Sequence, residues 1–353
     1  MISPFRAAAV SCVAVLVAAC AGVSAQRIIG ESDAEYIASH SVTESGVFVG
    51  GAASTPDRDT TGAGEGTGDL EPVPDRPPFA DAPTPGTTRT VTFTSSGVTR
   101  TARITVPADY DPARPLPVLV SFHGWKETAD SMERYTGFDA LPAIVVYGQG
   151  IENAWEGAPY ARTNDGQDLR YVLDLLGGLR STFTVDPARI YAAGMSNGGG
   201  FALKLACQRP DLFAGVASVS GAYYPRTRPP CAPQAVPVLE IHGAKDTWIR
   251  YDGGVRHGEE YAGPVAVLTA LARRNGGATT PVTTKVNDGV LRLTWAGDSP
   301  VDHLRVAATG HVWPRTADID ATQAVWGFLR AQARTAPDRA TPTTPLTGSP
   351  DRP

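Results

Sequence analysis

The sequence has no excess of basic charge, no long hydrophobic run beyond its N-terminus and few cysteines. Lysine and arginine number 31 against 36 aspartates and glutamates, so the net charge is −5 and no basic surface is expected for nucleic acid or anionic lipid. No internal apolar run approaches the ~20 residues that span a bilayer, which excludes a polytopic membrane protein. Four cysteines in 353 residues exclude a small disulfide-held scaffold. The 42% of hydrophobic residues is enough for one sizeable core.

Glycine and proline, by contrast, are abundant, at 37 and 30 residues. Between Gly51 and Gly86, 13 of 36 residues are glycine or proline, and the others follow neither a helical nor a strand period. We therefore expect residues 26–86 to be a low-complexity tether and residues 334–353, rich in proline and threonine, to be a disordered tail. Residues 87–333 remain as a single domain.

The N-terminus has the layout of a secretory signal. Residues 1–25 carry one positive charge, then an apolar run, then small residues. Two processing sites are compatible with this layout. Val23-Ser24-Ala25 fits cleavage before Gln26, whereas Val17-Ala18-Ala19-Cys20 resembles a bacterial lipobox in which Cys20 is lipidated. Both predict export to an extracytoplasmic location, and the lipobox, which we favour, adds a membrane anchor.

Export determines what we expect of the cysteines. Cys12 is removed with the signal, and Cys20 is either removed or lipidated. Cys207 and Cys231 then remain as a pair in an oxidising compartment, which predicts a disulfide between them. Two separate buried thiols are the alternative. Neither cysteine has ligands at zinc spacing, so no metal site is expected.

The domain alternates short apolar runs with amphipathic stretches. Residues 89–93 and 101–106 alternate apolar and polar side chains about a Ser-Ser-Gly turn, which predicts an antiparallel hairpin. Continuous apolar runs typical of strands buried on both faces follow at 117–122, 143–147, 189–193, 215–219, 236–241 and 301–307. Helices are predicted at 167–183, 197–207, 261–274 and 317–332. The pattern predicts an α/β fold with a mostly parallel central sheet, helices on both faces and an antiparallel edge hairpin.

The clearest chemical motif is Gly194-Met195-Ser196-Asn197-Gly198, a G-x-S-x-G between a predicted strand and a predicted helix. This context is the one that a nucleophile elbow requires. Glycines leave room for the sharp turn, and the helix N-terminus favours negative charge that develops beside the serine. A purely structural turn is the alternative, and we favour Ser196 as a nucleophile.

A serine nucleophile needs a base, and the base needs a carboxylate that orients it. In this architecture they follow the serine in the order acid, then histidine, at strand ends. Asp246 follows the run at 236–241 and His311 follows the run at 301–307, so we predict a Ser196, Asp246, His311 triad. Packing or hydrogen-bonding roles are expected for four other histidines, which are His123, His242, His257 and His303. The alternative acids are Asp252, Asp298 and Asp302.

The tetrahedral intermediate of acyl transfer needs two donors aimed at its oxyanion. We predict these donors to be the backbone N–H groups of Asn197 and of Trp125, which lies in the turn that follows the run at 117–122. Tryptophans in nearby loops are candidates either for the wall of a substrate site or for ordinary core packing, and they are Trp155, Trp248 and Trp313.

Five ordered segments between about 89 and 329 resemble the polyhydroxybutyrate depolymerase family, which grades into secreted feruloyl esterases of the α/β-hydrolase fold. They are Ser121-Phe122-His123-Gly124, Gly194-Met195-Ser196-Asn197-Gly198-Gly199, Leu205-Ala206-Cys207, His242-Gly243-Ala244-Lys245-Asp246 and Gly310-His311-Val312-Trp313-Pro314. The resemblance implies the Ser196, Asp246, His311 triad, a Cys207–Cys231 disulfide and ester hydrolysis with no metal or cofactor. Relatives often carry Cys or Ser where this chain has Trp125. The tail is too short to be an added polymer-binding domain.

The sequence therefore predicts an exported serine carboxylic-ester hydrolase that cleaves aliphatic or hydroxyalkanoate esters through an acyl-enzyme on Ser196. The first alternative is a carbohydrate-ester hydrolase that releases ferulate or acetate from plant polysaccharide. An acyltransferase and a non-catalytic surface binding protein on the same scaffold are further alternatives. The expected partners are a small or polymeric ester and, through lipidated Cys20, a membrane. No nucleic acid is expected, and a monomer is favoured.

Overall fold

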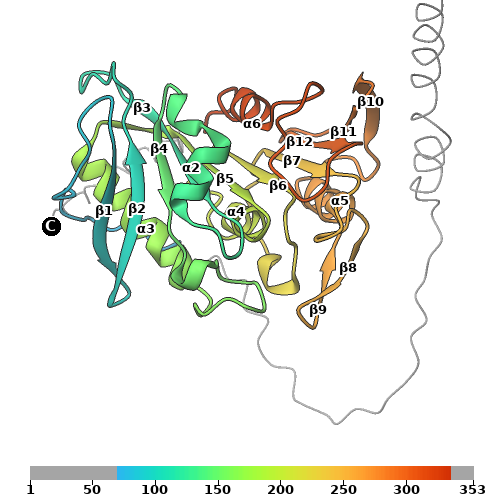
Figure 1. Ribbon diagram of the computed structural model, residues 1–353, viewed down its shortest axis with the longest axis horizontal. Coiled ribbons are helices and arrows are strands. Elements are labelled where there is room, and N and C mark those ends of the chain that lie inside the picture. The colour runs from blue at the N-terminus through green and yellow to red at the C-terminus, as the bar shows by residue number, and fades with distance from the viewer. Residues whose placement is uncertain (1–69, 335–353) are drawn as a thin grey trace, which may run out of the picture. The chain divides into compact units, whose positions relative to one another are not determined.

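A ten-stranded sheet lies at the centre of the computed structural model, which describes residues 70–334 (Figure 1). The expected signal at 1–25 with Cys20, residues 26–69 of the expected tether and residues 335–353 of the expected tail lie outside the described residues. Within 70–334, no helix is both long enough and apolar enough to cross a membrane.

The strands follow one another across the sheet in an order that differs from their order in the chain. From one edge to the other they are β1 (Thr88–Ser95), β2 (Val98–Thr105), β4 (Ile144–Gly148), β3 (Leu116–Phe122), β5 (Val185–Met195), β6 (Gly215–Val219), β7 (Val238–Gly243), β12 (Val301–Val306), β11 (Val290–Trp295) and β10 (Val282–Asn287). The six strands from β4 to β12 are parallel, and the pairs at both edges are antiparallel. The helices are α2 (Ala129–Thr136), α3 (Gln167–Thr182), α4 (Asn197–Gln208), α5 (Pro264–Arg274) and α6 (Ala321–Leu329).

The central strands are rich in apolar residues because both faces of the sheet are covered. Along β3, Val118 and Val120 join the buried cluster that contains the apolar side chains of α3 and α4. Leu119, between them, points the other way and joins the cluster that contains Met132 of α2 and Val325 of α6. This alternation is what the period of two in a strand requires. The predicted α/β fold class, with a mostly parallel sheet and the antiparallel hairpin β1–β2, is confirmed.

Several elements differ from the predicted ones at their ends. The helix predicted at 261–274 begins instead at Pro264, because residues 259–262 form a short strand, β9, that pairs with β8 (Gly253–Arg256). The helix predicted at 317–332 begins after Asp320, whose side chain accepts hydrogen bonds from the N–H groups of Thr322 and Gln323. Helix α2 and the edge hairpin β10–β11 were not predicted. Strand β10 is largely exposed, so its sequence has no apolar run to reveal it.

Residues 70–86, the last part of the stretch expected to be an unpacked tether, lie against helix α3. Phe79 is only 9% exposed and belongs to the same core cluster as the apolar face of α3. Two glycines of α3 permit this approach: a Cβ added to Gly177 would lie 2.2 Å from the carbonyl oxygen of Pro74, and one added to Gly178 would lie 2.4 Å from the Phe79 ring. The sparse apolar residues of this segment carry no period because it packs as an extended chain rather than as a helix or strand.

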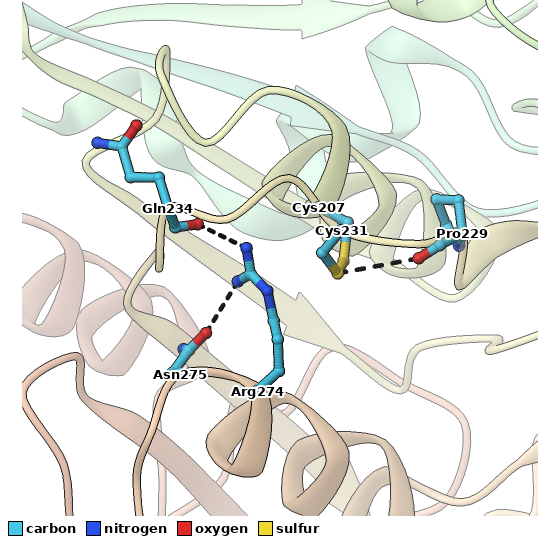
Figure 2. The surroundings of a disulfide bond; sticks show 6 residues. All are labelled: Cys207, Pro229, Cys231, Gln234, Arg274 and Asn275. Carbon is cyan, nitrogen blue, oxygen red and sulfur yellow. Dashed lines mark hydrogen bonds between the residues drawn. A yellow bond between two sulfur atoms is a disulfide. The ribbon is translucent and has the colours of Figure 1, made fainter. Parts of the chain in front are cut away.

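A disulfide joins Cys207, in the last turn of α4, to Cys231 in the loop that precedes β7 (Figure 2). The N–H of Ala232 donates to the carbonyl of Cys207 at 2.8 Å, so the backbone is paired beside the covalent link. Closing a loop of this length stabilises a chain by about 3 kcal/mol in the loop-entropy account. The disulfide holds the long β6–β7 connection against the helix that begins at the candidate nucleophile.

Candidate active site

Ser196 occupies the sharp turn between strand β5 and helix α4. Its backbone has φ 54° and ψ −117°, a conformation that a residue with a side chain rarely adopts. A Cβ added to Gly194 would lie 2.2 Å from the carbonyl oxygen of Gly198, and one added to Gly198 would lie 2.1 Å from that of Phe122. The glycines therefore allow the helix to start against the ends of both β5 and β3. Hydrogen bonds from Ser196 N–H to Val219 and from Ala222 N–H to Ser196 hold the strained turn.

The structure brings Ser196, His311 and Asp246 into one hydrogen-bonded chain. Ser196 Oγ lies 2.9 Å from His311 Nε2, and His311 Nδ1 lies 2.7 Å from Asp246 Oδ2. The other oxygen of Asp246 accepts the N–H groups of Trp248 and Ile249. Since the carboxylate accepts the Nδ1–H of His311, Nε2 keeps its lone pair toward the serine hydroxyl.

The Asp246 carboxylate is held in its charged form. Burial opposes ionisation, but hydrogen bonds from His242 and His311 outweigh it and bring the pKa of Asp246 well below its usual range. An ionised acid at this position orients the imidazole of His311 and stabilises it when it takes up a proton.

The two predicted oxyanion donors are free at this site. Within residues 70–334, neither the N–H of Trp125 nor that of Asn197 has an acceptor in the protein. A Cβ added to Gly124 would lie 3.5 Å from Ser196 Cβ, so the turn that carries Trp125 runs beside the serine. The side chain of Asn197 is paired twice with the backbone of Trp155, at 2.7 and 3.1 Å.

His123, just before this turn, holds it in place as a neutral imidazole. Burial lowers the pKa of His123 to about 4. Its Nδ1–H donates to the carbonyl of Gly124 at 2.8 Å, and its Nε2 accepts the N–H of Gly150 at 3.1 Å. One tautomer satisfies both contacts. This pairing is of the kind expected for His123 from the sequence.

The three tryptophans considered either for a substrate wall or for core packing separate into two kinds, and two of them pack in the core. Trp155 is fully buried between Phe122 and Phe201, and Trp313 is 7% exposed and packs on Phe138. Each belongs to one of the two buried clusters that pack on the sheet. Only Trp248 faces solvent: 56% of it is exposed, and its ring stacks on His311 at a centroid distance of 6.3 Å.

A small hairpin that was not predicted, β8–β9, places Arg256 and His257 beside two tryptophans near the site. Arg256 lies over the ring of Trp248 at 4.6 Å. The next residue, His257, meets the ring of Trp125 edge-on at 4.6 Å, and Tyr160 stacks on that same ring at 4.3 Å. We call Trp125, Tyr160, Trp248, Arg256 and His257 the aromatic rim. Only the alternation of Gly253–Arg256 with Glu259–Ala262 about a His-Gly turn could have indicated the hairpin.

The described residues show no arrangement suited to a metal: between 70 and 334, no group of three or more His, Cys, Asp or Glu side chains could hold an ion.

A serine on a strand–helix elbow, hydrogen-bonded through histidine to aspartate at the carboxyl ends of a mostly parallel sheet, defines the α/β-hydrolase fold. Residues 94–286 match the model of the esterase family, described as "Putative esterase". The chain belongs to this family.

Individual relatives agree with that membership. The chain is 35% identical over 190 residues to "Putative esterase NocK" of Nocardia uniformis subsp. tsuyamanensis, which covers 51% of this chain and 53% of the relative. It is 29% identical over 168 residues to "Probable feruloyl esterase C" of Aspergillus niger, which covers 45% of this chain and 59% of the relative. The matches thus span little more than half the length of these relatives. The solved acetyl xylan esterase of Aspergillus awamori shares the fold, with a TM-score of 0.51 and 16% identity over 69% of this chain and all of that one.

Proposed function

We propose that the protein is a serine carboxylic-ester hydrolase in which Ser196 is the nucleophile, His311 the general base and acid, and Asp246 the orienting carboxylate. The observation that carries the proposal is the hydrogen-bonded chain from Ser196 Oγ through both nitrogens of His311 to Asp246. Its position at the strained elbow beside two free backbone N–H groups supports it.

The reaction proceeds in two halves. His311 Nε2 takes the proton of Ser196 Oγ as the oxygen attacks the ester carbonyl carbon, and the carbonyl oxygen becomes an oxyanion. The N–H groups of Trp125 and Asn197 donate to that oxygen. His311 then gives its proton to the leaving alcohol, and the acyl group remains on Ser196. Water, deprotonated by His311, attacks the acyl-enzyme and releases the acid.

We propose an aromatic acyl ester of a carbohydrate, such as a feruloyl ester, as the substrate class. The aromatic rim supports this, since the exposed ring of Trp248 lies beside His311 and could contact a planar acyl group, while Trp125 and Tyr160 stack on each other at the oxyanion turn. The relative named feruloyl esterase C supports it independently.

A hydroxyalkanoate polyester is the second candidate. Three large apolar side chains near the site are strongly exposed: Trp248 at 56%, Val255 at 64% and Val312 at 46%. Such a surface suits contact with an apolar polymer. The sequence motifs of the chain also resemble those of the polyhydroxybutyrate depolymerase family.

Export through residues 1–25, with lipidation at Cys20 and a tether before residue 70, completes the proposal. It is supported by the layout of the sequence alone, because these residues lie outside the described range. On this proposal the enzyme works on the outer side of the membrane, where polymeric esters are found.

The test is covalent labelling by a fluorophosphonate together with ester turnover. We expect the wild type to be labelled and the Ser196→Ala variant to lose both the label and at least about 10³-fold of kcat. Ser181→Ala, at an exposed position of α3, is the matched control and should keep both. If Ser196→Ala still labelled and still hydrolysed esters, the assignment would be wrong.

Turnover of methyl ferulate faster than 4-nitrophenyl butyrate and hydroxybutyrate oligomers would support the first substrate class, and the reverse order would support the second.

A further inference from the structure

A second pair of buried ionisable groups lies directly behind Asp246, and the mechanism above does not use it. Glu240 and His242, both on β7, have no exposed surface. Glu240 Oε1 lies 3.0 Å from His242 Nδ1. The other ring nitrogen, Nε2, lies 2.8 Å from the carbonyl oxygen of Ile249 and 3.3 Å from Asp246 Oδ2. The imidazole of His242 thus stands between two carboxylates.

Counting protons fixes the state of this pair. Both neighbours of His242 Nε2 are acceptors, so Nε2 carries a hydrogen. Nδ1 faces a carboxylate oxygen, so a second proton lies between Nδ1 and Glu240. Burial alone would favour the neutral imidazole, but the Glu240 charge and the hydrogen bonds to Asp246 and Glu240 raise the pKa of His242 to about 10. His242 is therefore an imidazolium at neutral pH.

Other ionisable groups face this pair from each neighbouring element. On β12, His303 Nδ1 lies 2.7 Å from Glu240 Oε2, and His303 Nε2 lies 2.7 Å from the hydroxyl of Tyr251. The hydroxyl of Tyr223 donates to Glu240 Oε1 at 3.3 Å. Arg305 lies 5.6 Å from the Tyr251 ring. On the other side of His242, Asp246 is hydrogen-bonded to His311. Of the two buried histidines that contact Glu240, only His242 also reaches Asp246.

This difference defines a role for His242. We propose that His242 is a positioning residue of the triad: its ring, held between Glu240 and Asp246, directs the Asp246 carboxylate to His311 and moderates the negative charge that His311 meets. The proposal rests on the proposed hydrolase function and deepens it.

The role has a consequence for the pH dependence of activity. Replacing the imidazolium by a neutral amide removes the positive charge closest to Asp246, whether Glu240 then stays ionised or takes up a proton. The field of Asp246 on His311 becomes stronger, which favours protonated His311. The acid limb of the kcat/KM profile, which reports the loss of the free base, therefore moves to higher pH.

The experiment compares His242→Gln with its matched control His303→Gln, a buried histidine that contacts Glu240 but not Asp246. In His242→Gln we expect kcat to fall about 10- to 100-fold with little change in KM, as for one lost hydrogen bond to a charged group. We also expect the acid limb to rise by about half a pH unit to one unit. His303→Gln should lower the melting temperature but keep kcat within about threefold and leave the limb in place.

The proposal is overturned if folded His242→Gln keeps the wild-type kcat and acid limb, or if both variants change them equally, which would indicate a purely structural role. If His242→Gln fails to fold, long-range ¹H–¹⁵N spectra of the wild type decide the matter. Both nitrogens of His242 should carry hydrogen at pH 8, and a neutral ring there would overturn the proposal. Persistence of activity in Ser196→Ala would instead overturn the proposed function, so the two failures are distinguishable.

Discussion

Trp155 and Trp248 illustrate how the surroundings of one residue type decide its role. Trp155 is buried, its indole N–H donates to the carbonyl of His123 at 3.0 Å, and its ring stacks on Phe201. Trp248 has more than half of its surface in solvent, and its ring meets His311 and Arg256. The first ring stabilises the fold beneath the oxyanion turn, and we propose that the second contacts the substrate.

Alanine substitutions should separate these roles. Trp155→Ala should lower the free energy of unfolding by about 3–5 kcal/mol, because a large cavity opens in the core. Trp248→Ala should change it by less than about 0.5 kcal/mol and lower kcat/KM on methyl ferulate about 3- to 10-fold, with a smaller effect on 4-nitrophenyl butyrate. Urea unfolding and steady-state kinetics measure the two effects. Equal kinetic losses on both esters would argue against an aromatic acyl site at Trp248.

At the scale of elements, the extended segment before β1 behaves as part of the domain. The N–H of Phe79 donates to Thr182 Oγ1 at 3.0 Å, and its ring meets Phe93 at a centroid distance of 5.6 Å. Arg76 pairs with the buried Asp174 of α3 at 2.6 Å. The segment thus covers the face of α3 that carries its two glycines, and it contacts both β1 and α3.

Removal of the Phe79 ring tests whether this cover contributes to stability. Phe79→Ala should lower the free energy of unfolding by about 3 kcal/mol, because the ring is buried in the main core cluster. Leu70→Ala, at a position that is 41% exposed, is the control and should cost less than about 0.5 kcal/mol. Both values come from urea denaturation of the purified protein. If Phe79→Ala lowered the free energy of unfolding as little as Leu70→Ala does, the segment would not be packed on α3 in solution.

At the scale of the whole molecule, three buried groups contribute to the variation of stability with pH. The pKa of His242 is raised to about 10, that of Glu240 falls to about 2 because its histidine partners outweigh burial, and burial lowers that of His123 to about 4. Protonated His242 stabilises the fold at pH values below ~6.5, the pKa of an unfolded histidine. This contribution is lost as the pH rises toward 10. Because the pKa of His123 is lowered, the fold loses stability as the pH falls from about 6.5 to 4. The lowered pKa of Glu240 has the same effect as the pH falls from about 4.5 to 2.

The melting temperature should therefore be highest near pH 6.5 and decline on both sides. Each kcal/mol lost corresponds to about 2–4 °C for a domain of this size. Thermal unfolding followed by circular dichroism from pH 4 to 10 measures the profile. In His242→Gln the alkaline decline should become shallower, since the group that loses its proton there is gone. A wild-type melting temperature that still rises between pH 7 and 9 would contradict the assignment of His242 as a buried cation.

The sequence by itself determined what depends on neighbours along the chain. Continuous apolar runs identified the buried strands, and the glycines around Ser196 identified the elbow, because a sharp turn requires residues without a side chain at fixed offsets. The order of Ser196, Asp246 and His311 along the chain predicted which side chains the structure brings together. Only the tertiary structure decided what depends on contacts between distant segments. Burial of Trp155 and exposure of Trp248, the packing of residues 70–86 on α3, and the placement of His242 between two carboxylates each arise from segments that meet only after folding, and no local pattern carries that information.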